Sequence, residues 1–284
     1  MSIWNDLSWV ESIRTPFLSF FFESITLMGY PTFLILFISF GYFFWSSKRF
    51  SRVAILLFVS ALINSFLKDF FQDPRPPQEL MLDPQIGTSY GWPSGHTQIA
   101  VTLWGFLAYE LKDKLFTVFA VLLIALIAFS RMYLGVHDLG DIFSGLLIGL
   151  LILGIWPIGL KLNLDRELSH RSWLLLILGF QPLTFIIYPS HENHELSIWL
   201  LGVMSGWFIG ASSIELKLKQ IYKLLVSLTS VFIVFLSMIF ITQLEDNLNL
   251  VGVLDFGGSY LLGIIFSLIV TWIIPRIWKT LKLA

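Results

Sequence analysis

Three short polar segments interrupt an otherwise apolar chain, and together they hold the side-chain types that phosphoryl transfer requires. The segments are Lys68 to Pro76, Pro93 to His96 and Ser130 to Asp141. They supply fixed cations, histidines and carboxylates, which can attack a phosphorus atom and stabilise the charge on its oxygens. The residue types therefore indicate phosphoryl transfer in which cationic side chains do the work that magnesium does elsewhere.

The third segment contains a candidate nucleophile and the group that would orient it. His137 and Asp141 are four residues apart, so at the start of a helix they share one face. A carboxylate one turn away can hold the proton of one ring nitrogen and leave the other nitrogen basic. Such a pair alone is more often a capping feature, but Arg131 precedes it here. We assign Asp138 a structural role as the helix N-cap.

The second segment is typical of a phosphate cradle at a helix start. Ser94 occupies the N-cap position of the apolar stretch that follows, so the first free amides, including that of Gly95, face outward. A plain serine cap is the alternative interpretation. His96 favours the phosphate site, because an imidazole beside the cradle can protonate a leaving alkoxide.

The first segment indicates an anion site at shallow membrane depth. The apolar stretch Val53 to Leu67 would form a helix of about 22 Å against a hydrocarbon core of about 30 Å, which places Lys68 near the interface. Prolines prevent a helix in the loop that follows, so this loop can fold back and hold Arg75 near Lys68. Two cations held close together repel each other unless an anion lies between them.

The composition requires a membrane protein. The chain has 284 residues, of which 56% are hydrophobic and only 13% are charged, and its mean hydropathy is +0.79. A soluble globule usually has about a quarter charged residues. Cysteine is absent, which excludes disulfides and thiol catalysis.

We predict an all-α polytopic bundle of about nine transmembrane helices, made of a five-helix core and a four-helix C-terminal extension. Most of the apolar stretches are near the roughly 20 residues that a membrane helix needs. The candidate spans are Ser24 to Ser47, Val53 to Leu67, Thr97 to Tyr109, Leu115 to Ser130, Ile142 to Leu160, Ser172 to His194, Leu196 to Ile214, Leu224 to Leu244 and Phe256 to Pro275.

The basic residues predict which side of the membrane the polar segments face. Fourteen of the 18 Lys and Arg residues lie in one set of loops, and the positive-inside tendency makes that face cytoplasmic. The remaining four are Arg14, Lys68, Arg75 and Arg131. We therefore expect an integral membrane protein whose polar segments are on the non-cytoplasmic face. We place it in a bacterial cytoplasmic membrane, with that face toward the periplasm or exterior.

We expect three regions along the chain. Residues 1–23 are predicted to form an amphipathic helix lying in the outer interface, with Ile3, Leu7, Val10 and Ile13 or Phe17 at helical spacing. Residues 24–164 form the catalytic core, and residues 165–284 form a transmembrane extension for stability, dimerisation or shielding of the substrate. Small residues at Gly145 and Gly149, and at Gly202 and Gly206, are explained by helix packing.

These motifs resemble those of the type 2 phosphatidic acid phosphatase superfamily, which includes lipid phosphate phosphatases, glucose-6-phosphatase and vanadium haloperoxidases. That pattern is Lys, six residues, Arg-Pro; then Pro-Ser-Gly-His; then Ser-Arg, five residues, His, three residues, Asp. It corresponds here to Lys68 with Arg75-Pro76, to Pro93-Ser94-Gly95-His96, and to Ser130-Arg131 with His137 and Asp141. The resemblance covers roughly residues 24–164. Asp138 departs from it, because many relatives have an aromatic or apolar residue after the nucleophile.

The resemblance implies a role for each matched residue. His137 would form a phosphohistidine, Asp141 would orient it, and His96 would protonate the leaving group and later activate water. Phosphoryl oxygens would be bound by Lys68, Arg75, Ser94, the backbone amide of Gly95, and Arg131. No metal or other cofactor is implied. The expected partners are a phosphorylated lipid substrate and the bilayer, with no nucleic acid.

Three alternatives remain open at this point. A phosphotransferase would pass the phosphoryl group from the same histidine to another lipid, and a sugar phosphatase would use the same residues on a soluble substrate. A catalytically silent transporter or scaffold is a further alternative, although it predicts a replaced motif residue and all the motif residues are present.

Overall fold

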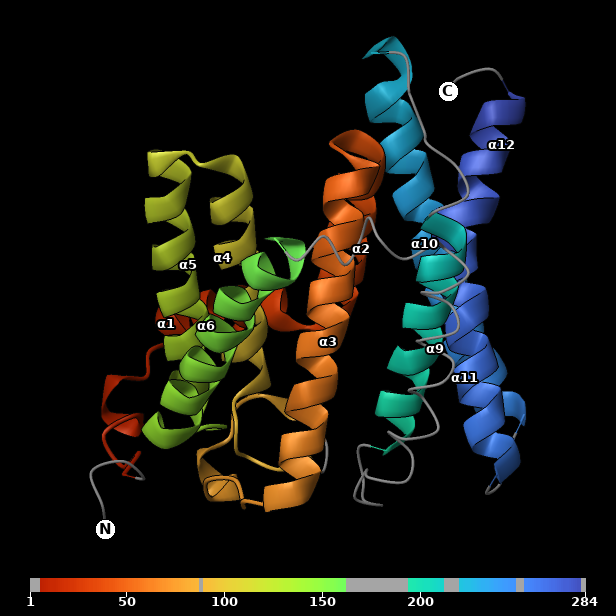
Figure 1. Ribbon diagram of the computed structural model, residues 1–284. Coiled ribbons are helices and arrows are strands. Elements are labelled where there is room, and N and C mark those ends of the chain that lie inside the picture. Colours follow the sequence, from red (N-terminus) through yellow and green to blue (C-terminus); the bar gives the residue numbers. More distant parts are fainter. Residues whose placement is uncertain (1–5, 87–88, 162–193, 212–219, 249–252, 282–284) are drawn as a thin grey trace. The chain divides into compact units, whose positions relative to one another are not determined.

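The structure is a computed structural model that describes residues 6–86, 89–161, 194–211, 220–248 and 253–281. All regular elements in these ranges are helices, and no strand occurs within them (Figure 1). The all-α class predicted from the apolar stretches is confirmed.

Five described helices are long and apolar enough to cross a membrane, and the chain is an integral membrane protein. They are Ser47–Phe71, Lys114–Tyr133, Leu139–Pro157, Ile221–Leu244 and Gly257–Thr280. The helices Pro16–Gly29 and Pro31–Phe44 are together long and apolar enough to cross a membrane, but the pair is bent by 58°. Two further predicted spans, Thr97 to Tyr109 and Leu196 to Ile214, correspond to shorter helices. The predicted span Ser172 to His194 lies outside the described residues except for His194.

The chain forms two compact units. Among the described residues, the first comprises residues 6–34, 59–86 and 89–161, and the second comprises residues 35–58, 194–211, 220–248 and 253–281. Each polar segment found in the sequence belongs to the first unit. The three regions predicted from the sequence remain a prediction.

The first unit contains α1 (Pro16–Thr26), the start of α2 (Pro31–Phe44), most of α3 (Ser47–Phe71), α4 (Gly95–Leu111), α5 (Lys114–Tyr133) and α6 (Leu139–Lys161). Helices α4 and α5 run antiparallel and are joined by a short link (Figure 1). Asp113 in this link caps α5 by accepting a hydrogen bond from the amide of Phe116 at 2.7 Å.

The second predicted span is longer than the sequence indicated. Helix α3 has 25 residues, Ser47–Phe71, whereas the uncharged stretch Val53 to Leu67 predicted 15. The helix continues beyond Leu67 because its polar side chains are covered by protein; Lys68 and Asp69 are buried. The prediction that Lys68 lies at shallow membrane depth rested on a helix of 15 residues, and the observed helix of 25 residues removes that argument.

The N-terminal segment also differs from the prediction. Leu7 and Val10 are buried in turns, and α-helix begins only at Pro16. The side chain of Asp6 accepts hydrogen bonds from the amide and hydroxyl of Ser8, which competes with helical pairing. The helix predicted from residue spacing is therefore interrupted before Pro16, and its place in the outer interface remains a prediction.

Polar contacts and small residues hold α4 against α3 and α6. The amide of Asn64 donates to Gln98 Oε1 at 2.9 Å and to Pro93 O at 3.2 Å, which ties α3 to the start of α4. A Cβ atom on Gly145 would lie 2.7 Å from the carbonyl oxygen of Ser94, and one on Gly149 would lie 2.7 Å from Val101 Cβ. The packing role predicted for both glycines is confirmed.

The second unit contains α9 (His194–Ala211), α10 (Gln220–Leu248), α11 (Val253–Leu268), a π-helix (Ile269–Ile273) and α12 (Ile274–Thr280). Helices α9 and α11 pack closely, because Cβ atoms on Gly202 and Gly206 would lie 2.1 Å and 2.5 Å from carbonyl oxygens of α11. The predicted packing role of these glycines is confirmed as well.

Gly135 is the position where the loop between α5 and α6 requires glycine. Its φ is +70°, and a Cβ there would lie 2.0 Å from the carbonyl oxygen of Leu80. Gly135→Ala should lower the free energy of unfolding by roughly 2–4 kcal/mol, because it adds backbone strain and a clash with main chain. Thermal unfolding in detergent would measure the loss.

The matched control is Gly154→Ala in α6, where a Cβ would meet nothing within 4 Å. This variant should keep or slightly raise the melting temperature, because alanine is the better helix former. Equal melting temperatures for the two variants would contradict the assignment of strain to Gly135.

Candidate active site

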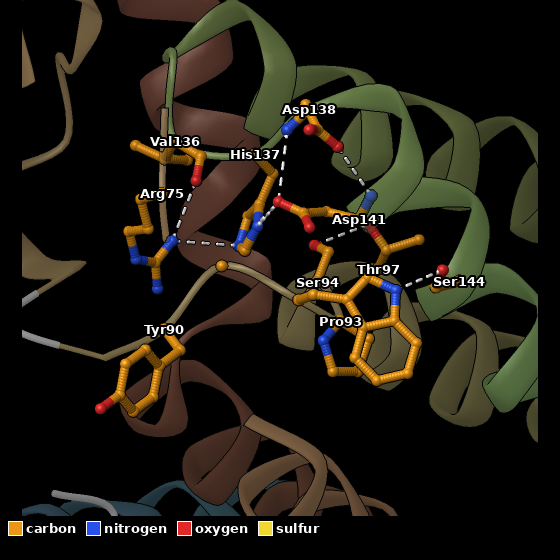
Figure 2. Close-up of polar contacts among 12 residues, drawn as sticks. Arg75, Tyr90, Pro93, Ser94, Thr97, Val136, His137, Asp138, Asp141 and Ser144 are labelled. Carbon is orange, nitrogen blue, oxygen red and sulfur yellow. Dashed lines mark hydrogen bonds and ion pairs between the residues drawn. The ribbon is translucent and has the colours of Figure 1, made fainter. Parts of the chain in front are cut away.

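His137 lies between a carboxylate and a guanidinium, and these two neighbours determine its tautomer. Its Nδ1 is 2.9 Å from Asp141 Oδ2, and its Nε2 is 3.3 Å from Arg75 Nη1 (Figure 2). A guanidinium can only donate, so Nε2 accepts and the ring proton is on Nδ1, where it is donated to Asp141. The imidazole is buried and presents a lone pair at Nε2.

The start of α6 holds Asp141 in position. Asp138 caps this helix, because its Oδ1 accepts from the amide of Asp141 at 2.9 Å, and the amide of Asp138 is 3.3 Å from Asp141 Oδ2. The capping role predicted for Asp138 is confirmed. Helix α6 begins at Leu139, so His137 precedes it and Asp141 lies in its first turn.

Arg75 is fixed by the loop between α3 and α4 as well as by the histidine. Its Nε donates to Ser89 O at 2.5 Å, its Nη2 donates to Ser89 Oγ at 2.7 Å, and its Nη1 donates to Val136 O at 2.9 Å. Figure 2 shows the guanidinium directed at His137. Burial and the nearby charge of Arg131 lower the pKa of Arg75 to about 10, so it remains cationic at neutral pH.

Lys68 is a buried cation at the end of α3. Its Nζ donates to the carbonyl oxygens of Tyr90 and Gly91, the latter at 2.9 Å. These bonds use two of the three ammonium donors. They also attach α3 to the segment that leads into α4, where a Cβ on Gly91 would lie 3.3 Å from Asp141 Oδ2.

Ser94 is the N-cap of α4, in the position predicted, but its hydroxyl does not cap the helix. The hydroxyl is 3.0 Å from that of Thr97, while the amide of Ser94 donates to the carbonyl oxygen of Asp141 at 3.1 Å. The next residue, Gly95, opens the helix, and the amides of a first helical turn lack intrahelical acceptors.

His96 follows in the same turn of α4, and it is contacted by the segment between α1 and α2, which consists of the 3-10 helix Leu27–Gly29 and Tyr30. Its ring packs edge-to-face on Tyr30, with ring centroids 4.6 Å apart. A Cβ on Gly29 would lie 2.2 Å from His96 Cδ2. The buried Nε2 of His96 has no hydrogen-bond partner among the described residues, so it is free to exchange a proton with a bound group.

Arg131 is held by groups that lie outside the three polar segments of the sequence. It is almost fully buried, and its Nη1 donates to Asp83 Oδ2 at 2.8 Å and to the hydroxyl of Thr26. The hydroxyl of Tyr30 donates to the same oxygen of Asp83. Asp83, Thr26 and Tyr30 do not belong to any of the three sequence motifs, so only the tertiary structure identifies them.

The structure thus brings the predicted residues into one region of the first unit. Burial, followed by the charges of Lys68, Arg75 and Arg131, holds the pKa of His137 well below its ordinary value, so the imidazole is neutral at neutral pH. A neutral imidazole surrounded by cations is suited to attack an anionic phosphoryl group.

No group of three or more His, Cys, Asp and Glu side chains is close enough to hold a metal ion in the part of the chain that the structure describes. Two carboxylates of the site are paired with basic side chains. Asp141 is bonded to His137, and Asp83 is bonded to Arg131.

Comparison with known proteins identifies the class that this site and helical fold define. Residues 49–163 match the PAP2 superfamily. The chain is 33% identical over 192 residues to lipid phosphate phosphatase delta of Arabidopsis thaliana, covering 57% of this chain and 46% of that protein. It is 30% identical over 153 residues to phosphatidylglycerophosphatase B of Bacillus subtilis, covering 49% and 74%.

A third relative is a dihydrosphingosine 1-phosphate phosphatase of Saccharomyces cerevisiae, which is 27% identical over 227 residues, covering 71% of this chain and 55% of that protein. The chain therefore spans about half the length of the Arabidopsis and yeast relatives. It belongs to the PAP2 superfamily, as its motifs indicated. The matched range contains the predicted site residues.

The charges around His137 make its titration testable without an activity assay. Arg75→Gln should raise the pKa of His137, because it removes a cation and a donor that favour the neutral ring. NMR titration of protein with ¹⁵N-labelled histidine would measure the shift. Lys114→Gln, which removes an exposed cation of α5, is the control and should leave that pKa unchanged. An unchanged or lower pKa in Arg75→Gln would contradict the electrostatic assignment.

Proposed function

We propose that the protein is a membrane phosphatase that hydrolyses a phosphomonoester or diphosphate of a lipid through a phosphohistidine on His137. The observation that carries the proposal is the pair of contacts on His137, to Asp141 at Nδ1 and to Arg75 at Nε2. In this arrangement the lone pair of Nε2 adjoins a fixed cation, where a phosphoryl group would be bound.

In the first step, Nε2 of His137 attacks phosphorus and the bond from phosphorus to the ester oxygen breaks. The leaving alkoxide takes a proton from Nε2 of His96, which carries that proton as an imidazolium while the phosphoryl anion is bound and becomes neutral in this step; this buried Nε2 is unpartnered in the described structure. Asp141 accepts the hydrogen bond from Nδ1 throughout, so it stabilises the positive charge that develops on the ring.

In the second step, water attacks the phosphohistidine, and His96 accepts the proton of that water. The nitrogen–phosphorus bond breaks, inorganic phosphate leaves, and His137 returns to its neutral form. Both steps place negative charge on the equatorial oxygens of phosphorus. We assign the binding of these oxygens to Lys68, Arg75, Ser94, the amide of Gly95, and Arg131.

Fixed cations replace a metal in this proposal. Lys68, Arg75 and Arg131 act on the same buried histidine, and preorganised charges are effective where water is excluded. The matched residues need no added Lewis acid to balance a phosphoryl dianion. The proposed reaction is therefore metal-independent.

The proposed substrate is a phosphorylated lipid, and the proposed location of the site is the non-cytoplasmic face. The relatives named above include phosphatases of phosphatidylglycerophosphate and of dihydrosphingosine 1-phosphate. The apolar helices that carry the site would keep a lipid tail in the bilayer. The sidedness is supported by the distribution of basic residues, with a bacterial inner membrane as the proposed location.

A substrate panel tests this function. Purified protein in detergent should release phosphate from at least one long-chain lipid among isoprenyl, glycerol-based, sphingoid and lipid A phosphates, without an acceptor lipid. EDTA should leave the rate unchanged, whereas vanadate should inhibit as a trigonal-bipyramidal mimic. Faster hydrolysis of soluble short-chain or sugar phosphates, phosphate release only with an acceptor lipid, or magnesium-dependent activity would each contradict part of the proposal.

The two histidines should fail at different steps. His137→Ala should abolish both turnover and the acid-labile phosphoenzyme, because no nucleophile remains. His96→Ala should lower turnover by roughly 10²- to 10⁴-fold, the usual range for a general acid, while still forming phosphoenzyme with a substrate that has a good leaving group. Rapid quench with ³²P-labelled substrate would distinguish the two. Full activity of His137→Ala would refute the assignment.

A further inference from the structure

Asp83 contacts Arg131 directly and is linked to His96 through Tyr30. Its Oδ2 accepts hydrogen bonds from Arg131 Nη1 and from the hydroxyl of Tyr30, and its Oδ1 accepts from the amide of Gln85 at 3.1 Å. Both carboxylate oxygens are therefore occupied by donors. Burial would raise the pKa of Asp83, but the bond from Tyr30 and the charge of Arg131 outweigh burial and hold the pKa below its ordinary value.

The contacts of Arg131 occupy one edge of its guanidinium. Nη1 is bonded to Asp83 and Thr26, whereas the buried Nε has no partner among the described residues. A buried donor without an acceptor is costly, and such groups in native proteins need an explanation. A phosphoryl oxygen bound beside Arg131 would supply that acceptor.

Tyr30 acts on His96 through its ring and on Asp83 through its hydroxyl. Its ring meets that of His96 edge-to-face, at 4.6 Å between centroids and 86° between planes. The Cζ atom of Arg131 lies 5.9 Å from the centre of the Tyr30 ring. Tyr30 thus contacts His96, Arg131 and Asp83, which are the candidate general acid, a candidate phosphate-binding residue and the carboxylate that holds it.

The local sequence explains why Tyr30 and Asp83 can reach these positions. Each precedes a proline, which disfavours helix at that residue. Tyr30 is extended, at φ −82° and ψ 148°, in the break where the helix pair bends by 58°. Asp83 lies in the loop before Pro84. Tyr30 is also outside the range 49–163 that matches the superfamily, so a residue N-terminal to that range contacts the site.

Tyr30 and Asp83 also border a cleft. The cleft has a volume of about 320 Å³ and is also lined by Thr26 and apolar residues such as Leu27 and Leu82. A buried ion pair that served only to hold the fold would not need a tyrosine shared with His96.

We propose that Tyr30 and Asp83 are positioning residues, through which Nη1 of Arg131 is fixed so that its Nε binds a phosphoryl oxygen and the ring of His96 is held for proton transfer. This inference rests on the proposed function. It predicts two separable effects: the carboxylate and the tyrosine hydroxyl govern phosphate binding, and the tyrosine ring governs protonation of the leaving group.

Binding is tested with Tyr30→Phe and Asp83→Asn. Both should weaken vanadate binding and raise KM by roughly tenfold, the usual effect of losing a hydrogen bond to a charged group, with a smaller change in kcat. Thermal stabilisation by vanadate gives the affinity without turnover. Tyr133→Phe is the matched control, because it removes a buried tyrosine hydroxyl that lies 3.0 Å from Ser19 Oγ, and should leave vanadate affinity unchanged.

Protonation is tested with Tyr30→Leu, which removes the ring from His96. Its kcat should fall at least about tenfold more for a long-chain alkyl phosphate than for p-nitrophenyl phosphate, because an aryl oxide leaves without protonation. Tyr30→Phe keeps the ring and should show no such difference between the two substrates.

Unchanged vanadate affinity in Tyr30→Phe and Asp83→Asn, or equal losses on both substrates in Tyr30→Leu, would overturn the inference. Wild-type protein that binds vanadate but hydrolyses no phosphate ester would overturn the proposed function instead, and the vanadate affinities would still decide the role of Asp83. Variants that lose activity together with their melting temperature, while Tyr133→Phe keeps both, would show a merely structural role and also overturn the inference.

Discussion

The hydrogen bond between His137 and Asp141 is the contact around which the site is organised. It places the ring proton on Nδ1 and thereby leaves Nε2 as an acceptor facing Arg75. Burial and three nearby cations keep this ring neutral. Without the carboxylate, the tautomer would be free to change, and a donor at Nε2 would face a guanidinium that can only donate.

This contact in turn depends on close helix packing. The backbone of α6 reaches the start of α4, where the amide of Ser94 donates to the carbonyl oxygen of Asp141 at 3.1 Å. That approach is possible because Gly145 has no side chain between the two helices. Asn64 attaches the same start of α4 to α3. The three polar segments therefore meet because three helices of the first unit are held at short range.

Much of the fold followed from the distribution of apolar and charged residues, and the errors have physical causes. Helix α3 is longer than predicted because Lys68 and Asp69 are buried by protein and continue the helix beyond the uncharged stretch. The N-terminal helix begins later than predicted because Asp6 forms a local turn with Ser8. Hydropathy does not register either kind of contact.

The sequence by itself determined the all-α membrane class, the superfamily motifs and the pairing of His137 with Asp141, because helical periodicity and residue spacing are local properties. Only the tertiary structure decided that Arg131 is held by Asp83 and Thr26, and that Tyr30 adjoins His96. These contacts join residues that are 48 or more positions apart in the chain. Their geometry depends on how α1, α2 and the loop before α4 pack, which no local spacing encodes.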